Sequence, residues 1–113
     1  MNKNIINLNE RKIQVYIEKN RPPIELRDKL DLGYSYNRDV IELFEIRPIW
    51  SKPNEFQNLS FAKIKHVKTK KIWKLYWMRA SGKWQSYEPF PESSNLEELL
   101  LVIHEDSYGC FKG

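Results

Sequence analysis

The chain has 113 residues, 41% of them hydrophobic and 30% charged, and a formal net charge of +4 at pH 7. These are the proportions of an ordinary globular protein and predict a single domain over residues 1–113. No apolar run approaches the roughly 20 residues of a membrane span, and the N-terminus lacks the apolar region of a secretory signal, so we expect no membrane association and a cytoplasmic location. The positive charge favours an anionic partner only if the charges cluster.

A helix over about Leu8 to Lys19 is the first element that the sequence predicts. Asn7 followed by Glu10 has the spacing of a capping box, which begins a helix. The apolar residues that fall close to one helical face are Ile6, Ile13, Tyr16 and Ile17. The run from Asn20 to Pro23 ends the helix, because proline has no amide hydrogen to donate and restricts the residue before it.

Two strands and a loop are predicted next. Apolar and polar residues alternate from Leu30 to Tyr36, which is the period of a half-buried strand. A turn at Asn37 to Asp39 leads to a second strand over Val40 to Arg47, which Pro48 ends. The serine, proline and asparagine residues between Ile49 and Leu59 predict a loop at the sheet edge.

The second half of the chain predicts three strands and a helix. The strands cover Phe61 to Lys68, Ile72 to Ala80 and Lys83 to Glu88, and the prolines of Pro89-Phe90-Pro91 stop the sheet. Ser94 with Glu97 forms a second capping box, for a helix that ends near Asp106 with Gly109 placed to terminate it. The fold class is therefore α+β, an antiparallel five-stranded meander sheet with an N-terminal and a C-terminal helix packed on one face.

The turns set the predicted register of the last three strands. Val67 is placed opposite Ile72, and a two-residue loop at Ser81-Gly82 pairs Tyr76 with Tyr87. The face expected beneath the helices carries Ala62, Ile64, His66, Trp73, Leu75, Trp77 and Trp84. The solvent face carries Lys63, Lys65, Val67, Ile72, Lys74, Tyr76, Met78, Lys83, Gln85 and Tyr87.

A basic face that bears tyrosines is typical of a surface for single-stranded nucleic acid, where rings stack on bases and lysines contact phosphates. The binding residues predicted for this function are Lys63, Lys65, Lys74, Tyr76, Lys83 and Tyr87. The alternative is an ordinary solvated sheet face, on which lysines form the polar half of the alternation.

Three charged residues form a second candidate site. Asp31, Glu45 and Arg47 resemble the carboxylates and lysine of a metal-dependent nuclease, in which adjacent strands hold Mg²⁺. Arginine stands where that chemistry needs lysine, and a guanidinium hardly ever deprotonates, so a structural ion pair explains these residues more simply. The sequence therefore favours a non-catalytic protein.

The classical soft-metal ligands are few, and their spacing matches no metal pattern. His66 is expected as a hydrogen-bonded core residue, His104 in the last turn of its helix, and Cys110 as a buried thiol. We therefore expect no metal and no cofactor. An unidentified protein is the alternative partner, for which the predicted loop from Ile49 to Phe56 offers Trp50 as an interface anchor.

Several motifs together resemble a small bacterial family that is catalogued as domain of unknown function 3024. They are RPP at Arg21 to Pro23, LDLGY at Leu30 to Tyr34, ELFEIRP at Glu42 to Pro48, the run VKTKKIWKLYWMR with KW and YEP from Val67 to Pro89, and ED, YGCF and a final glycine at the C-terminus. The resemblance covers nearly the whole chain and implies one compact bacterial domain. It implies no activity, cofactor or catalytic residue.

Overall fold

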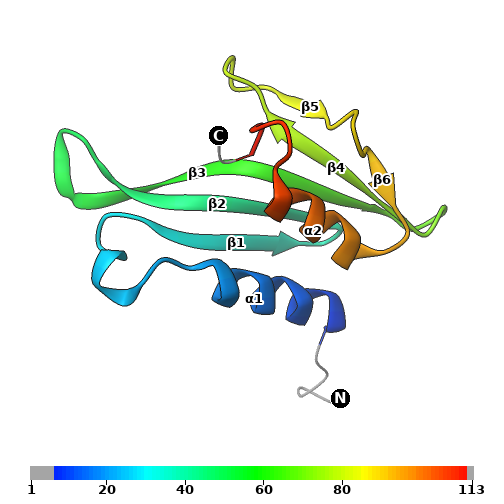
Figure 1. Cartoon of the computed structure of the whole chain (residues 1–113), viewed down its shortest axis with the longest axis horizontal. Coiled ribbons are helices and arrows are strands. Elements are labelled where there is room, and N and C mark those ends of the chain that lie inside the picture. Colours follow the sequence, from blue (N-terminus) through cyan, green and yellow to red (C-terminus); the bar gives the residue numbers. More distant parts are fainter. Residues whose placement is uncertain (1–6, 112–113) are drawn as a thin grey trace.

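The computed structural model describes residues 7–111. Its elements in chain order are α1 (Leu8–Asn20), the short 3-10 helix η1 (Ile24–Leu26), β1 (Asp31–Asn37), β2 (Val40–Ile49), β3 (Lys52–Val67), β4 (Ile72–Met78), β5 (Trp84–Ser86), β6 (Glu92–Ser93) and α2 (Leu96–Glu105), as Figure 1 shows. Five antiparallel strands follow one another in the order β1-β2-β3-β4-β5, and β6 pairs with β4. The predicted α+β meander with two terminal helices is confirmed.

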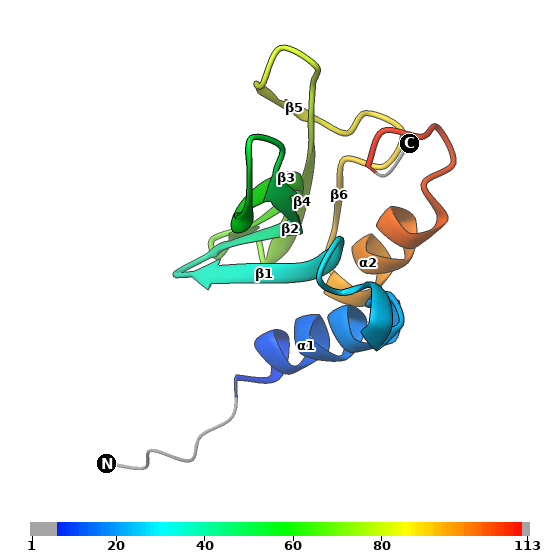
Figure 2. The same ribbon diagram turned by 90° about the vertical axis from the view of Figure 1, so that its left-hand side faces the viewer.

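Both helices lie on the same side of the sheet, as Figure 2 shows. Their apolar faces and the inward-pointing residues of the strands form one core, because alternate strand residues point to the same face. The core consists of Ile13, Tyr16, Ile17, Leu32, Ile41, Leu43, Phe61, Ala62, Ile64, Trp73, Leu75, Tyr87, Leu96, Leu99, Leu100, Ile103 and Phe111. We call the opposite side of the sheet the open face, because within residues 7–111 neither helix packs against it.

The start of α1 follows the prediction, whereas the start of α2 does not. Asn7 Oδ1 accepts hydrogen bonds from the backbone of α1, but Ile6 lies outside the described residues. At α2 the capping residue is Asn95 rather than Ser94, and its Oδ1 accepts from the Glu97 backbone at 2.9 Å. The predicted cap is therefore one residue early, because asparagine caps a helix as well as serine does.

The prediction of a loop between Ile49 and Leu59 is wrong. β2 continues to Ile49 and β3 begins at Lys52, so the chain forms a long hairpin in which Pro48 lies opposite Phe56. The pairing is irregular directly after Pro48, which is where a residue without an amide hydrogen can be accommodated in a ladder. We call the part of this hairpin from Arg47 to Leu59 the arm.

The predicted pairing of β4 with β5 is wrong by one residue. The backbone N–H of Gly82 donates to Arg79 at 2.8 Å, and Arg79 donates to Lys83 at 2.9 Å, which closes a hairpin loop of three residues. Gly82 has φ 86°, a left-handed conformation that favours glycine in such loops. Met78 therefore lies opposite Trp84, and every side chain of β5 is on the face opposite to the predicted one.

The sheet also continues beyond the predicted stop at Pro89. Tyr87 N–H donates to the Leu75 carbonyl and Leu75 N–H donates to the Pro91 carbonyl, each at 2.9 Å, so the chain between them leaves the sheet edge and returns. β6 then resumes the pairing with β4. This detour brings Tyr87 into the core, where its ring centroid lies 4.8 Å from that of Phe111.

Candidate functional site

The open face carries lysines and large apolar side chains on strands β2 to β5. By strand alternation and pairing it carries Val40, Glu42, Phe44, Ile46, Ser60, Lys63, Lys65, Val67, Ile72, Lys74, Tyr76, Met78 and Trp84. None of these side chains is buried. Lys65 is exposed and the others are partly buried, so the face is a solvent-accessible surface of mixed basic and aromatic character.

Lys63 lies between two aromatic rings of this face. Its Nζ is 5.1 Å from the ring centroid of Tyr76 and 5.3 Å from that of Trp84. Tyr76 is the direct cross-strand neighbour of Lys63, and the pairing of Met78 with Trp84 brings the indole to the same side. At these distances each ring attracts the ammonium through its π face, which holds the lysine over both rings.

Two further lysines lie next to this group. Lys65 and Lys74 are directly opposite each other on β3 and β4. Like charges in such a cross-strand pair repel and destabilise the sheet slightly. Glu92 lies opposite Lys74 on the other side and Glu42 lies opposite Lys63, so the positive charge of the face is reduced at two points.

Apolar side chains extend the open face toward the arm. The ring of Phe44 lies over Gly33, its cross-strand partner: a Cβ added at Gly33 would lie 2.6 Å from Phe44 Cε1 and 3.3 Å from Ile46 Cδ1. A side chain at this position would displace the ring, so Gly33 permits the close approach. On the arm, Phe56 continues the same surface and is 51% exposed.

Four of the six predicted binding residues come together on the open face: Lys63, Lys65, Lys74 and Tyr76. Lys83 and Tyr87 do not, because the one-residue shift of β5 turns both away from it. Tyr87 is only 2% exposed, and burial is the main cause that raises the pKa of its hydroxyl. Trp84 was predicted beneath the helices and instead lies on the open face, opposite Met78. No local signal could have placed it, because Gly82 suits a hairpin loop of two residues as well as one of three.

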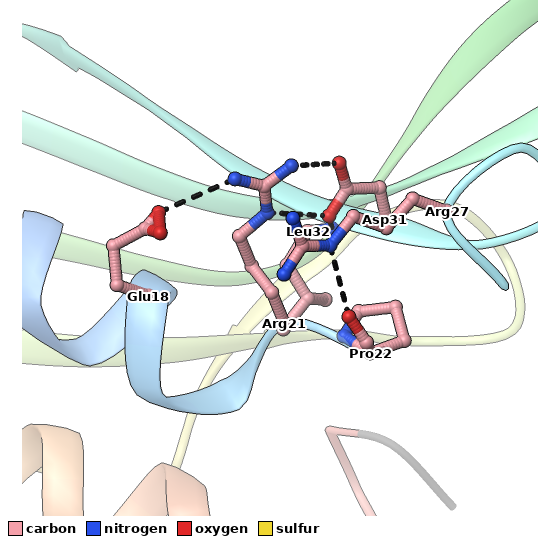
Figure 3. A network of polar contacts seen from close by, with 6 residues as sticks. All are labelled: Glu18, Arg21, Pro22, Arg27, Asp31 and Leu32. Carbon is pink, nitrogen blue, oxygen red and sulfur yellow. Dashed lines mark hydrogen bonds and ion pairs between the residues drawn. The ribbon is translucent and has the colours of Figure 1, made fainter. Parts of the chain in front are cut away.

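Asp31 of the candidate nuclease site is held in an ion pair with the end of α1, as Figure 3 shows. Arg21 Nε and Nη2 donate to its two carboxylate oxygens at 2.9 and 2.7 Å, and Arg21 Nη1 donates to Glu18 at 3.3 Å. The Arg21 hydrogen bonds are the main cause that lowers the pKa of Asp31. This bidentate pair connects the first helix to the first strand.

Glu45 and Arg47 lie apart from Asp31. Arg47 Nε donates to Glu45 at 2.9 Å, which is the structural ion pair that the sequence suggested. Glu45 lies opposite Leu32 whereas Asp31 lies opposite Ile46, so the two carboxylates alternate to different faces. Within residues 7–111 no three His, Cys, Asp or Glu side chains are grouped so that they could hold a metal ion.

The two histidines and the cysteine lie outside the buried core. His66 is half-buried rather than a core residue, because it lies near the end of β3, where its ring stacks on Trp73 at 4.2 Å. Its Nδ1 is 4.0 Å from Asp39 Oδ1. His104 is in the last turn of α2, as predicted. Cys110 was predicted as a buried thiol and is only partly buried, because it packs against the edge of the core.

These features define an α+β protein in which two helices cover one side of a meander sheet and leave the other side open. The family model described as Domain of unknown function (DUF3024) matches residues 1–113, and the chain belongs to this family. Searches of curated proteins and of solved structures found no match. Among residues 7–111, neither helix has the length and apolar character to span a membrane.

Proposed function

We propose that the protein is a non-catalytic binding domain whose open face binds single-stranded nucleic acid. The observation that carries the proposal is the position of Lys63 between Tyr76 and Trp84, next to the cross-strand pair of Lys65 and Lys74. Three cations and two aromatic rings in one solvent-accessible area supply both parts of single-strand recognition, phosphate contact and base stacking.

The proposed binding mode follows from the contacts of Lys63. In the free protein its ammonium lies over both rings. A phosphate of the strand attracts the ammonium more strongly than a ring does, because the phosphate carries a full charge. Lys63 then moves toward the phosphate and exposes the ring faces for stacking by neighbouring bases. A duplex is excluded as the main ligand, because its bases are already stacked and cannot reach the rings.

The repulsion between Lys65 and Lys74 favours the same ligand. The two ammonium groups are cross-strand neighbours, so a bound phosphate between them removes an unfavourable interaction of the free protein. The sheet fixes the positions of the two Cα atoms, so the side chains can approach one phosphate without a rearrangement of the backbone. This part of the face contributes affinity and no base preference, since phosphate contacts carry no sequence information.

Fluorescence anisotropy with a labelled single strand of about 12 nucleotides tests the proposal, since single-strand sites on OB folds cover about 4–16 nucleotides. Lys65→Glu is expected to weaken binding strongly, and Tyr76→Ala or Trp84→Ala to weaken it by about 1–3 kcal/mol each. The matched controls are Lys29→Glu and Tyr108→Ala, which change exposed residues outside the open face. Equal effects of the open-face and control variants would exclude this site.

The arm supports a second candidate function, the binding of another protein. Trp50 at its tip is 95% exposed, and a large exposed ring is a typical anchor of protein interfaces. We expect Trp50→Ala to change the free energy of unfolding by less than about 0.5 kcal/mol, since the ring contributes little to the core. A photo-cross-linking residue at position 50 is expected to form a specific adduct in cells, whereas one at exposed Lys70 is not. Absence of any adduct specific to position 50 would refute this function.

A further inference from the structure

The two helices enclose a groove on the side of the molecule opposite the open face. α1 and α2 lie next to each other on the sheet, as Figure 2 shows, and the groove between them has a volume of about 470 Å³. This is within the size range of ligand sites. Buried Tyr16 and Leu100 form its floor, and Val15 and Leu101 at its edges are 41% and 54% exposed. The groove is therefore apolar and accessible.

Polar contacts between the helices limit this groove at both ends. Lys12 Nζ is 3.4 Å from Glu97 Oε1 near the start of the helices. Near their ends, His104 Nδ1 is 3.1 Å from Asn20 Oδ1. Lys12 and Asn20 are separated by about 12 Å along the axis of α1, at a rise of about 1.5 Å per residue. The apolar stretch between the two contacts is thus slightly more than two helical turns long.

The charges that line the groove are mainly positive. Arg11 and Lys19 line it on either side of Val15, at the four-residue spacing that puts all three on one face of α1. Neither cation forms an ion pair with the described residues. Glu97 is the one carboxylate among the described lining residues, and Lys12 already pairs with it. Two cations about 12 Å apart are therefore available to a ligand.

We propose that this groove binds an acidic amphipathic helix of a partner protein. Apolar side chains of that helix at i, i+3 and i+4 contact Val15 and Leu101, which is the usual way in which a helix occupies a groove. Carboxylates two turns apart on the same helix reach Arg11 and Lys19. A lipid or another amphiphile with a single carboxylate would use only one of these cations, so the charge pattern favours a helix. This site is independent of the proposed nucleic-acid surface.

The test uses two synthetic peptides of about 15 residues, a length at which an isolated helix becomes marginally stable. Both carry leucines on one face, and two flanking positions two turns apart are glutamate in the first peptide and lysine in the second. Binding to the full chain is measured by anisotropy of a label on the peptide. The double variant Arg11→Glu with Lys19→Glu is compared with Lys70→Glu, a charge reversal in the β3–β4 turn. Far-UV circular dichroism verifies that the variants fold.

We expect the acidic peptide to bind at least about tenfold more tightly than the basic one, because two charge pairs are gained and two repulsions avoided. The double variant is expected to lose this preference, and Lys70→Glu to retain it. Equal affinities of the two peptides, no binding of either, or an unchanged preference in the double variant would overturn the proposal. Decanoate serves as an amphiphile with a single carboxylate. If it binds and the acidic peptide does not, the proposal is overturned and the groove is a site for an amphiphile.

Discussion

Replacement of Tyr87 by alanine, with Trp84→Ala for comparison, tests the observed register of β5. Tyr87 is 2% exposed and packs against Phe111, so its loss removes a buried aromatic ring. Such a loss costs about 3–5 kcal/mol. At roughly 4 °C per kcal/mol for a domain of this size, the melting temperature falls by about 12–20 °C. Trp84 is only partly buried and lies on the open face, so its replacement is expected to cost less than that of Tyr87. The contact with Lys63 accounts for about 0.5–1 kcal/mol of that cost.

Urea unfolding followed by far-UV circular dichroism measures both free energies. The denaturant dependence should be the same for both variants, so that the difference in midpoint reports stability alone. The expected order is a larger loss for Tyr87→Ala than for Trp84→Ala. If Trp84→Ala were as destabilising as Tyr87→Ala, the indole would be in the core and the register described above would be refuted.

Three further substitutions have distinct expected results. Glu42→Gln should strengthen oligonucleotide binding at low salt, because it removes the carboxylate opposite Lys63; an unchanged affinity in the same anisotropy titration would argue against phosphate at that lysine. Lys65→Glu should weaken oligonucleotide binding and yet raise the free energy of unfolding by about 0.2–1 kcal/mol, since it replaces a repulsive cross-strand pair with an attractive one. A loss of stability in urea would contradict this. Asp31 has a lowered pKa in the folded protein, so its ionised form stabilises the fold above the unfolded pKa of about 3.9 and this contribution is lost as the pH falls below it. Asp31→Asn should therefore be less stable near neutral pH and lose less stability on acidification, and parallel curves of unfolding free energy against pH for the two proteins would show that the ion pair contributes nothing.

The parts of the site that the sequence predicted depend on a strong local signal. The turn between β3 and β4 has Val67 opposite Ile72, as predicted, and the alternation of lysine with apolar residues along β3 then places Lys63, Lys65 and Tyr76 correctly. Period-two alternation over a long strand with one buried face specifies its register strongly. The meander with two helices followed from the same periodicities.

The parts that the sequence did not predict depend on loop length and on pairing over a long distance. A loop of two or three residues at Ser81-Gly82 is compatible with the same glycine, and only the longer one places Trp84 on the open face. The arm was predicted as a loop because Pro48 and Pro53 are poor strand residues. Backbone pairing between the two halves of the hairpin outweighed that local preference. Contacts between α1 and α2, and hence the groove, join residues far apart in the sequence and have no local signal.

The dependence of oligonucleotide affinity on salt tests the central proposal most directly. If Lys63, Lys65 and Lys74 each neutralise one phosphate of a single strand, log K plotted against log salt should have a slope of about −2, from roughly −0.7 per contact. Lys74→Gln should reduce the size of this slope by about 0.7, whereas Lys70→Gln in the adjacent turn should leave it unchanged. A slope near zero, or an equal change in both variants, would show that the open face does not bind the phosphates of a single strand.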